Sequence, residues 1–184
     1  MMNLEEIGVR AREAEPVLRT IETKIKNRVL KKAAENLVAD ADAILAANAL
    51  DMEHGKEKGM SKGLLDRLFL DQSRIASMAE GICQVSELDD PIGEVLGMKK
   101  RPNGLLIGQK RVPLGVVGII YEARPNVTAD AFALCFKTGN VVILKGGSDA
   151  IHSNMAIVAS LRKTLKEEQI PEDALLLIED TSRE

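Results

Sequence analysis

Residues 139–148 read GNVVILKGGS, and this stretch decides the expected fold. Gly139 suits the left-handed conformation that closes a helix, and the β-branched residues after it favour a strand over 140–145. The glycine pair then makes a tight turn, after which Ser148 stands in position to cap a further helix. This alternation of helix and strand predicts an α/β fold.

Two other apolar runs extend this pattern on either side. Residues 115–120 read GVVGII and suit a strand that is buried on both faces, while LLLI at 175–178 begins a third strand. A helix over about 129–137 connects the first two strands, so the sequence predicts a parallel, Rossmann-like sheet. Two crossovers alone would leave this sheet incomplete and its edge unpaired, so we expect a longer parent chain or a partner.

The chain before Pro91 follows helical periodicity instead. Apolar side chains recur at helical spacing over residues 4–18 and at every fourth position over 21–45, which predicts two amphipathic helices. Residues 54–63 hold three lysines and three glycines, so we expect an exposed loop there. Asp71 then begins another helix.

A hairpin separates the helical part from the sheet. Residues 95–100 and 105–112 have the character of strands, and they flank the turn sequence RPNG at 101–104. The Asn-Gly pair is typical of a tight hairpin turn. We therefore expect a protruding, two-stranded β-hairpin arm.

Composition excludes several classes of protein. Hydrophobic residues make up 45% and charged residues 29% of the chain, as in an ordinary globular protein. The net charge is -3 and the basic residues are scattered, so nucleic acid is not an expected partner. The charged N-terminus and the lack of long apolar runs predict no membrane segment and a cytoplasmic location. Cys83 and Cys135 lack metal-ligand spacing, which indicates reduced thiols and no metal site.

The first candidate site is the turn after the central strand. This turn would combine a positive charge, a close approach of the backbone and a helix N-terminus, supplied by Lys145, Gly146, Gly147 and Ser148. Such a combination favours an anion, for example the phosphate of a cofactor. The alternative is a plain strand-to-helix connection with a solvated Lys145. No Gly-x-Gly-x-x-Gly or P-loop motif occurs, which argues against an ordinary Rossmann fingerprint and against a kinase.

The second candidate site is YEARPNVT at residues 121–128, which follows the first strand at its carboxyl end, where open α/β sheets bind ligands. Arg124 can hold a phosphate or carboxylate with two hydrogen bonds, and the Asn126 amide can donate to an oxyanion. The alternative is that Pro125 and Asn126 only turn the chain, with Asn126 capping the next helix.

The run VPLGVVGIIYEARPNVT at residues 112–128 closely resembles the γ-glutamyl phosphate reductases, a family within the aldehyde dehydrogenase superfamily. The likeness continues through KGGS at 145–148 and IEDTSRE at 178–184, and it covers essentially the whole chain. The resemblance implies an NADPH-dependent reduction of L-glutamate 5-phosphate to L-glutamate 5-semialdehyde and phosphate, a step of proline biosynthesis. It also implies a homo-oligomer.

The resemblance implies roles for single residues. Asn126 matches the asparagine that stabilises the oxyanion, and Lys145 matches the lysine that contacts the adenosine ribose. Ser148 stands where NAD-preferring relatives often carry Glu, so an uncharged side chain there tolerates the 2′-phosphate of NADPH. Further contacts implied at the cofactor are Gly146, Gly147, Glu122, Ala123 and Pro125, and Arg124 is the expected substrate-binding residue.

The resemblance also divides the chain. Residues 1–92 are the expected helical part of a cofactor-binding domain, 93–112 the hairpin arm, and 113–184 the first part of the parallel sheet. The family's nucleophilic cysteine lies in a catalytic domain beyond the end of this chain, so we expect the chain alone to be inactive. Cys135 falls within a helix and does not replace that cysteine.

Two alternative functions remain. An NAD-dependent, aldehyde-oxidising dehydrogenase is disfavoured by Ser148 and by the Arg124-Pro125-Asn126 sequence, where such enzymes usually read Pro-Trp-Asn. A non-catalytic module would bind another chain through its helices and through residues 95–112. His54 and His152 have no assigned role, and we expect both on the solvated surface.

Overall fold

The computed structural model describes residues 3–181, so residues 182–184 of the quoted IEDTSRE run lie outside the described part. The elements, in chain order, are α1 (Leu4–Thr20), α2 (Thr23–Ala39), α3 (Ala41–Glu57), α4 (Lys62–Leu68), α5 (Gln72–Glu87), β1 (Val95–Lys100), β2 (Leu106–Lys110), β3 (Val116–Ile120), α6 (Asn126–Lys137), β4 (Val141–Lys145), η1 (Ser148–Ala150), α7 (Ile151–Glu167), η2 (Glu172–Ala174) and β5 (Leu175–Leu177).

The sheet is parallel, as predicted. Its strand order is β3-β4-β5, with β4 in the centre. Val116 to Ile120 pair in register with Val141 to Lys145, so the carboxyl ends of β3 and β4 lie side by side. Gly139 has φ 70° and closes α6 in the left-handed region, which confirms the expected helix end.

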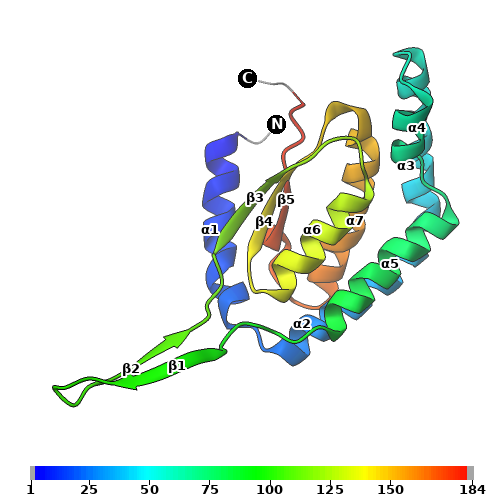
Figure 1. Cartoon of the computed structure of the whole chain (residues 1–184). Coiled ribbons are helices and arrows are strands. Elements are labelled where there is room, and N and C mark those ends of the chain that lie inside the picture. The colour runs from blue at the N-terminus through cyan, green and yellow to red at the C-terminus, as the bar shows by residue number, and fades with distance from the viewer. Residues whose placement is uncertain (1–2, 182–184) are drawn as a thin grey trace.

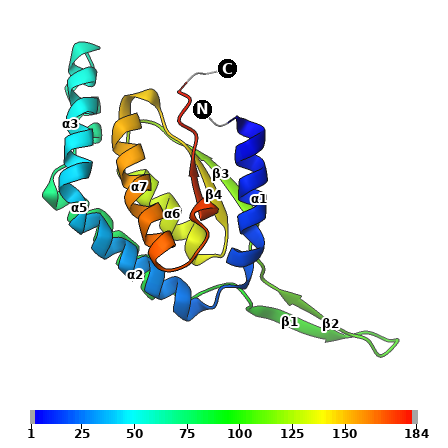
Figure 2. The same cartoon turned by 180° about the vertical axis from the view of Figure 1, so that it is seen from behind.

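The helices form layers on both sides of this sheet (Figures 1 and 2). The crossover helices α6 and α7 cover one face, and α1 packs on the opposite face against β3, β4 and β5. Helices α2 and α5 form a further layer outside α6 and α7. The core between the layers is aliphatic with two stacked phenylalanines, Phe132 and Phe136, which are both fully buried.

The expected second helix is two helices. The run over residues 21–45 is interrupted at Asp40, which ends α2 and begins α3. The Asp40 carboxylate accepts hydrogen bonds from Ser160 Oγ at 2.8 Å and Lys163 Nζ at 3.0 Å, both on α7. The break is therefore held by a tertiary contact that the periodicity of the sequence does not report.

The loop predicted over residues 54–63 is wrong, because α3 continues to Glu57 and α4 begins at Lys62. Gly55 is buried inside α3. A Cβ at this position would lie 2.8 Å from Met60 Sδ and 3.1 Å from Leu65 Cδ2, so the glycine lets the chain fold back closely over α3. This glycine serves packing rather than flexibility.

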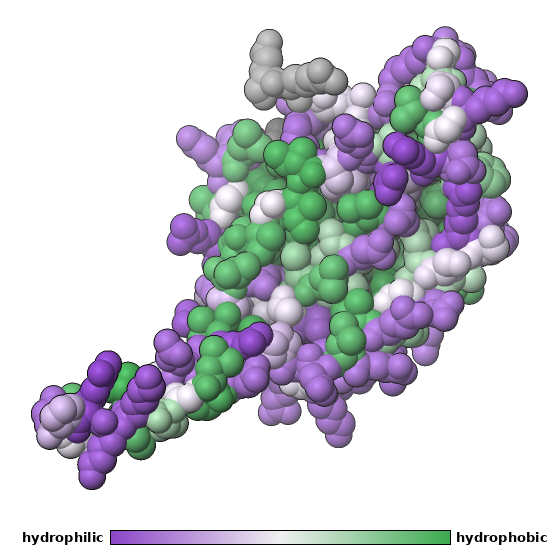
Figure 3. Space-filling view, viewed as in Figure 1, coloured by the Kyte–Doolittle hydropathy of each residue, from purple (hydrophilic) through white to green (hydrophobic). Residues whose placement is uncertain are grey.

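Strand β3 differs from the expectation that it is buried on both faces. Among the described residues its only strand neighbour is β4, and Ile120 at its end is 83% exposed. Figure 3 shows apolar side chains gathered over this edge and along the arm. The exposed apolar residues of this region are Val95, Leu96, Met98, Leu105, Leu106, Ile107, Val112, Leu114 and Ile120.

The hairpin arm is confirmed and projects from the body (Figure 1). β1 and β2 pair antiparallel, and none of their residues is buried. Gly104 has φ 91° in the turn, which only glycine adopts without strain. At the base, Asp90 accepts hydrogen bonds from Lys26 Nζ and Thr23 Oγ1, each at 2.8 Å, and the Lys26–Asp90 ion pair is almost completely buried.

Ser148 does not cap the helix after β4, contrary to expectation. It opens the short 3-10 turn η1, and α7 begins only at Ile151. The first turn of α7 is held instead by the carboxylate of Asp51, which accepts from the backbone N–H groups of His152 at 3.2 Å and Ser153 at 2.7 Å. Asp51 lies on α3 and is 2% exposed. A cap supplied from 101 residues away cannot be found by a local sequence pattern.

His54 is exposed, as expected, whereas His152 departs from the expectation of a freely solvated side chain. His54 belongs to the last turn of α3, and its ring centroid lies 5.6 Å from that of His152. His152 is in the first turn of α7, where its Nδ1 lies 2.7 Å from the buried Asp51 Oδ1. His152 is therefore fixed by a buried carboxylate rather than freely solvated.

Candidate functional site

The two candidate sequence segments meet at the carboxyl end of the sheet. The turn after β4 packs against the loop after β3, because a Cβ on Gly147 would lie 3.7 Å from Glu122 Cα and 3.8 Å from Ala123 N. A Cβ on Gly146 would lie 2.3 Å from Asn154 Nδ2. Position 146 therefore needs glycine for close packing, whereas a side chain at position 147 would make ordinary contacts. The residues expected at the cofactor lie next to one another.

Lys145 ends β4 at the same edge of the sheet. Its Nζ donates a hydrogen bond to the backbone oxygen of Asp180 at 2.9 Å, so the side chain reaches across to the segment that follows β5. The backbone of Lys145 also accepts from Tyr121 N at 3.1 Å. The lysine thus connects the ends of all three strands.

A polar network next to these strand ends is not predicted by the sequence. Tyr121 Oη and Thr128 Oγ1 are 2.6 Å apart, and Thr128 Oγ1 donates to Asn154 Oδ1 at 2.9 Å. Burial raises the pKa of Tyr121, although its hydrogen bond with Thr128 acts in the opposite direction. The network fixes the loop after β3 to α6 and α7, and no motif marks these three positions.

Asn126 is the first residue of α6, with Pro125 just before it. The alternative that Asn126 caps this helix is wrong, because no side-chain cap hydrogen bond is present. The Asn126 Nδ2 instead donates to Asp130 Oδ2, one turn along the same helix, at 3.3 Å. The amide therefore faces outward from the start of α6 and is not used to close the turn.

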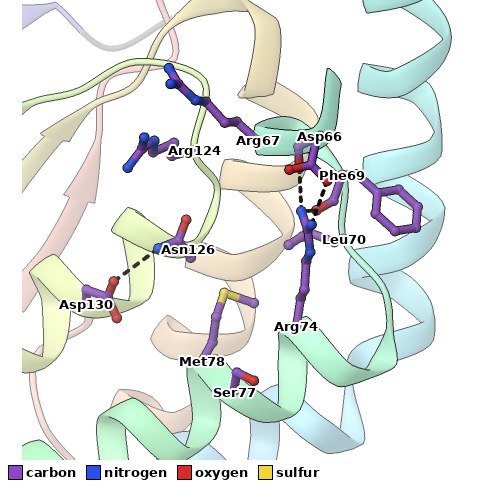
Figure 4. Close-up of a pocket in the computed structure, with 10 residues that line it drawn as sticks. All are labelled: Asp66, Arg67, Phe69, Leu70, Arg74, Ser77, Met78, Arg124, Asn126 and Asp130. Atoms are coloured by element: carbon purple, nitrogen blue, oxygen red, sulfur yellow. Dashed lines mark hydrogen bonds and ion pairs between the residues drawn. The ribbon is translucent and has the colours of Figure 1, made fainter. Parts of the chain in front are cut away.

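A pocket opens beside Asn126 (Figure 4). It has a volume of about 390 Å³ and lies between α6, α5 and the segment around α4. Its lining residues are Asp66, Arg67, Phe69, Leu70, Arg74, Ser77, Met78, Arg124, Asn126 and Asp130. The structure thus brings Arg124 and Asn126 to one pocket, whereas Lys145, Gly146, Gly147 and Ser148 do not line it.

Of the three arginines that line this pocket, one forms an ion pair within the described part of the chain and two do not. Arg74 bonds to Asp66 Oδ1 at 2.8 Å and stacks over Phe69, with 5.5 Å to the ring centroid. Within residues 3–181, Arg67 and Arg124 form no ion pair and are exposed toward the same side of the pocket. Two available guanidinium groups near a neutral amide donor make this pocket suited to an anionic ligand.

The thiols are not part of this site. Cys135 is 8% exposed within α6, and burial raises its pKa to about 11. A thiol with such a pKa is protonated at neutral pH and is a poor nucleophile. In the described part of the chain, no group of His, Cys, Asp and Glu could hold a metal ion. No helix of residues 3–181 is long and apolar enough to cross a lipid bilayer.

A protein-family model described as the aldehyde dehydrogenase family matches residues 2–184. The chain belongs to the aldehyde dehydrogenase family. The γ-glutamyl phosphate reductase of Heliobacterium modesticaldum is 60% identical over 177 residues, which are 96% of this chain and 42% of that protein. The γ-glutamyl phosphate reductase of Agathobacter rectalis is 55% identical over 184 residues, covering 100% of this chain and 44% of that protein.

The solved structures agree with this assignment to the aldehyde dehydrogenase family. The crystal structure of γ-glutamyl phosphate reductase from Thermotoga maritima has a TM-score of 0.96 and 46% identity to this chain. The match covers 99% of this chain and 44% of that one. This aldehyde dehydrogenase family chain therefore spans less than half the length of the relatives it matches.

Proposed function

We propose that the protein containing this chain reduces L-glutamate 5-phosphate to L-glutamate 5-semialdehyde and phosphate, with NADPH as the reductant. The observation that carries this proposal is the 60% identity to a γ-glutamyl phosphate reductase across nearly the whole chain. The pocket with Arg124, Arg67 and Asn126 supports it chemically, because the substrate has two anionic ends and a reacting carbonyl.

Asn126 is the proposed oxyanion donor. An amide nitrogen carries two hydrogens, and Asp130 accepts only one of them in the structure. The second is available to a carbonyl oxygen that gains negative charge when a nucleophile attacks its carbon. The nucleophile is proposed to be a cysteine in the part of the longer protein beyond this chain, since Cys135 is buried and this burial raises its pKa.

The turn after β4 is the proposed cofactor site. The family assignment supports a nicotinamide dinucleotide, which when bound supplies the hydride, and NADPH is the finer proposal. Lys145 and the backbone of Gly146 and Gly147 would hold the adenosine ribose side, with Glu122, Ala123 and Pro125 on the facing loop. Ser148 has no charge to repel a 2′-phosphate, which favours NADPH over NADH.

The domain organisation is proposed on the same basis. Residues 1–92 and 113–184 together form part of the cofactor-binding domain, and residues 93–112 form an arm that contacts another copy of the protein. The apolar side chains exposed on that arm support a homo-oligomer. The catalytic domain is proposed to belong to the segment that makes up the remainder of the longer relatives.

The test is a reverse assay on the full-length protein with L-glutamate 5-semialdehyde, NADP⁺ and inorganic phosphate. We expect NADPH to form only when phosphate is present, because phosphate must cleave the acyl intermediate. NAD⁺ should be a poor substitute. Phosphate-independent oxidation with NAD⁺ would support the aldehyde-oxidising alternative, and no turnover with either cofactor would support a non-catalytic module.

A further inference from the structure

Asp130 is a carboxylate in the pocket wall that no cation neutralises. It is half-buried on α6, and within residues 3–181 it forms no ion pair. Its one polar side-chain contact there is the 3.3 Å hydrogen bond from Asn126 Nδ2. The other acidic side chain of the pocket, Asp66, is already bonded to Arg74. Asp130 is therefore the carboxylate of this pocket that can accept a positively charged ligand group.

The surroundings of Asp130 leave it accessible from the pocket. Its Oδ1 faces Gly81 of α5, where a Cβ would lie 3.7 Å away, an ordinary contact distance. The other groups that line this side are Ser77, Met78 and Asn126 (Figure 4). The charged groups of the pocket are Arg67, Arg74, Arg124 and Asp66.

Burial makes this carboxylate unfavourable in the free protein. Desolvation raises the pKa of Asp130, and the hydrogen bond from Asn126 opposes that shift only in part. A cation that bonded to the carboxylate would relieve this penalty. Asp130 Oδ2 lies 3.3 Å from Asn126 Nδ2, so a cation bound to this carboxylate would lie beside the proposed oxyanion donor.

The spacing along α6 matches the substrate. Asn126 Nδ2 and Asp130 Oδ2 lie 3.3 Å apart, so two ligand atoms that bond to them from different sides, at about 2.9 Å each, can be separated by roughly 6 Å. In an extended glutamyl chain, five bonds separate the reacting carbonyl oxygen from the α-nitrogen, and bonds of about 1.5 Å give a separation of roughly 6 Å. A substrate lying along α6 can therefore place its carbonyl at Asn126 and its ammonium group at Asp130.

We propose that Asp130 is a specificity-determining residue that binds the α-ammonium group of the amino-acid substrate. This inference rests on the proposed function and deepens it. The ammonium group donates to the Asp130 carboxylate, and Arg67 and Arg124 remain for the carboxylate and phosphate groups. A ligand of the same length without the amino group leaves Asp130 without a cation and is bound less tightly.

The experiment compares two aldehydes in the reverse, phosphate-dependent assay on the full-length protein. One is L-glutamate 5-semialdehyde, and the other is 5-oxopentanoate, which has the same chain without the amino group. We expect Asp130→Asn to lower kcat/KM for the amino substrate by about 10-fold to 100-fold through KM, as expected when a hydrogen bond to a charged group is lost. The value for 5-oxopentanoate should stay within about 2-fold. Glu80→Gln, a carboxylate-to-amide change on α5 outside the pocket, is the matched control.

The outcomes separate the alternatives. If Asp130→Asn lowers kcat equally for both aldehydes, Asp130 acts by orienting Asn126 and the proposal is overturned. It is also overturned if neither substrate is affected. If the wild-type protein shows no phosphate-dependent turnover, the proposed function fails, and a thermal-shift comparison of L-glutamate with glutarate then decides the inference. Stabilisation by L-glutamate that Asp130→Asn abolishes supports it, and equal shifts by both ligands contradict it.

Discussion

At the scale of single residues, the pocket depends on where α6 begins. Pro125 precedes the helix and Asn126 is its first residue, so the asparagine side chain is not needed as a cap and faces the pocket. The helical register then fixes Asp130 one turn further along the same face. Two functional groups of opposite hydrogen-bonding character are thus positioned by a single helix, and a shift of one residue would separate them.

Asn126→Ala tests the proposed oxyanion donor. We expect kcat of the full-length enzyme to fall by about 10²-fold to 10³-fold, because a preorganised donor to the developing charge is removed. KM should change little, since the interaction strengthens only in the transition state. Steady-state kinetics would measure this, with Gln84→Ala on the exposed side of α5 as the control. An unchanged kcat would contradict the proposed catalytic role and leave Asn126 only as the first residue of α6.

Lys145→Ala tests the proposed cofactor site. We expect KM for NADPH to rise by about 10-fold or more, because a charged hydrogen bond to the cofactor is lost. Isothermal titration with NADPH would show the same loss directly. Since Lys145 also bonds to the Asp180 backbone, thermal unfolding of the variant must be compared with wild type. An unchanged affinity in a normally folded variant would remove Lys145 from the cofactor site.

At the scale of elements, α3 and α7 are joined by Asp51. Its carboxylate accepts from the two backbone N–H groups described above and from Ser153 Oγ at 2.6 Å. A helix start that is fixed by a side chain from another helix couples the formation of both. The α3–α7 contact thereby supports the turn after β4, which carries the proposed cofactor site.

Asp51→Ala should therefore destabilise the protein by about 2–4 kcal/mol, because it leaves buried N–H groups without an acceptor. Ser148→Ala is the matched control and should change stability by less than about 0.5 kcal/mol, since Ser148 does not cap α7. Urea unfolding followed by circular dichroism would compare the two variants. Equal losses of stability would contradict the assignment of the cap to Asp51.

The elements that the sequence predicts correctly are those with strong local signals. The Asn-Gly turn at Asn103 and the left-handed Gly139 predict the arm and the end of α6. Two of the failures involve contacts between residues far apart in the sequence, namely the break at Asp40 that α7 holds and the cap that Asp51 supplies to α7. Periodicity records which face of a helix is buried, but it does not record which partner buries it.

The candidate site shows the same division. Arg124 and Asn126 could be proposed because they follow a strand at its carboxyl end. Asp130 was not found, because a single aspartate inside a helical pattern is indistinguishable from a solvated one. The Tyr121–Thr128–Asn154 network likewise depends on three segments that meet only in the folded chain.

At the scale of the whole molecule, apolar surface is concentrated at one side. Leu114 is 87% exposed, and it lies near the open edge of β3 between the sheet and the arm. On one face of the arm Met98 lies over Gly108, where a Cβ would come within 2.3 Å of its sulfur, and Leu106 follows on the same face. Surfaces of this kind are typical of contacts between subunits.

Leu106→Asp should reduce the assembled mass of the full-length protein, because a charge is introduced into an apolar contact. Gln109→Asp, on the opposite face of the same strand, is the matched control and should leave the mass unchanged. Analytical ultracentrifugation over a range of protein concentrations measures both. If Leu106→Asp assembles as the wild type does, the arm is not the contact between copies.

The ion pair at the base of the arm should make hydrogen exchange differ between the base and the strands of the arm. The buried Lys26–Asp90 pair fixes the arm where it leaves the body, whereas the strands beyond it form an isolated two-stranded ribbon. Such a ribbon is marginally stable in water, so its amide protons should exchange with solvent within seconds in a lone protomer. Protection at Ile107 would then rise with protein concentration while protection near Ile92 stayed constant. Hydrogen exchange at single residues of the arm would thus report how much of the protein is associated.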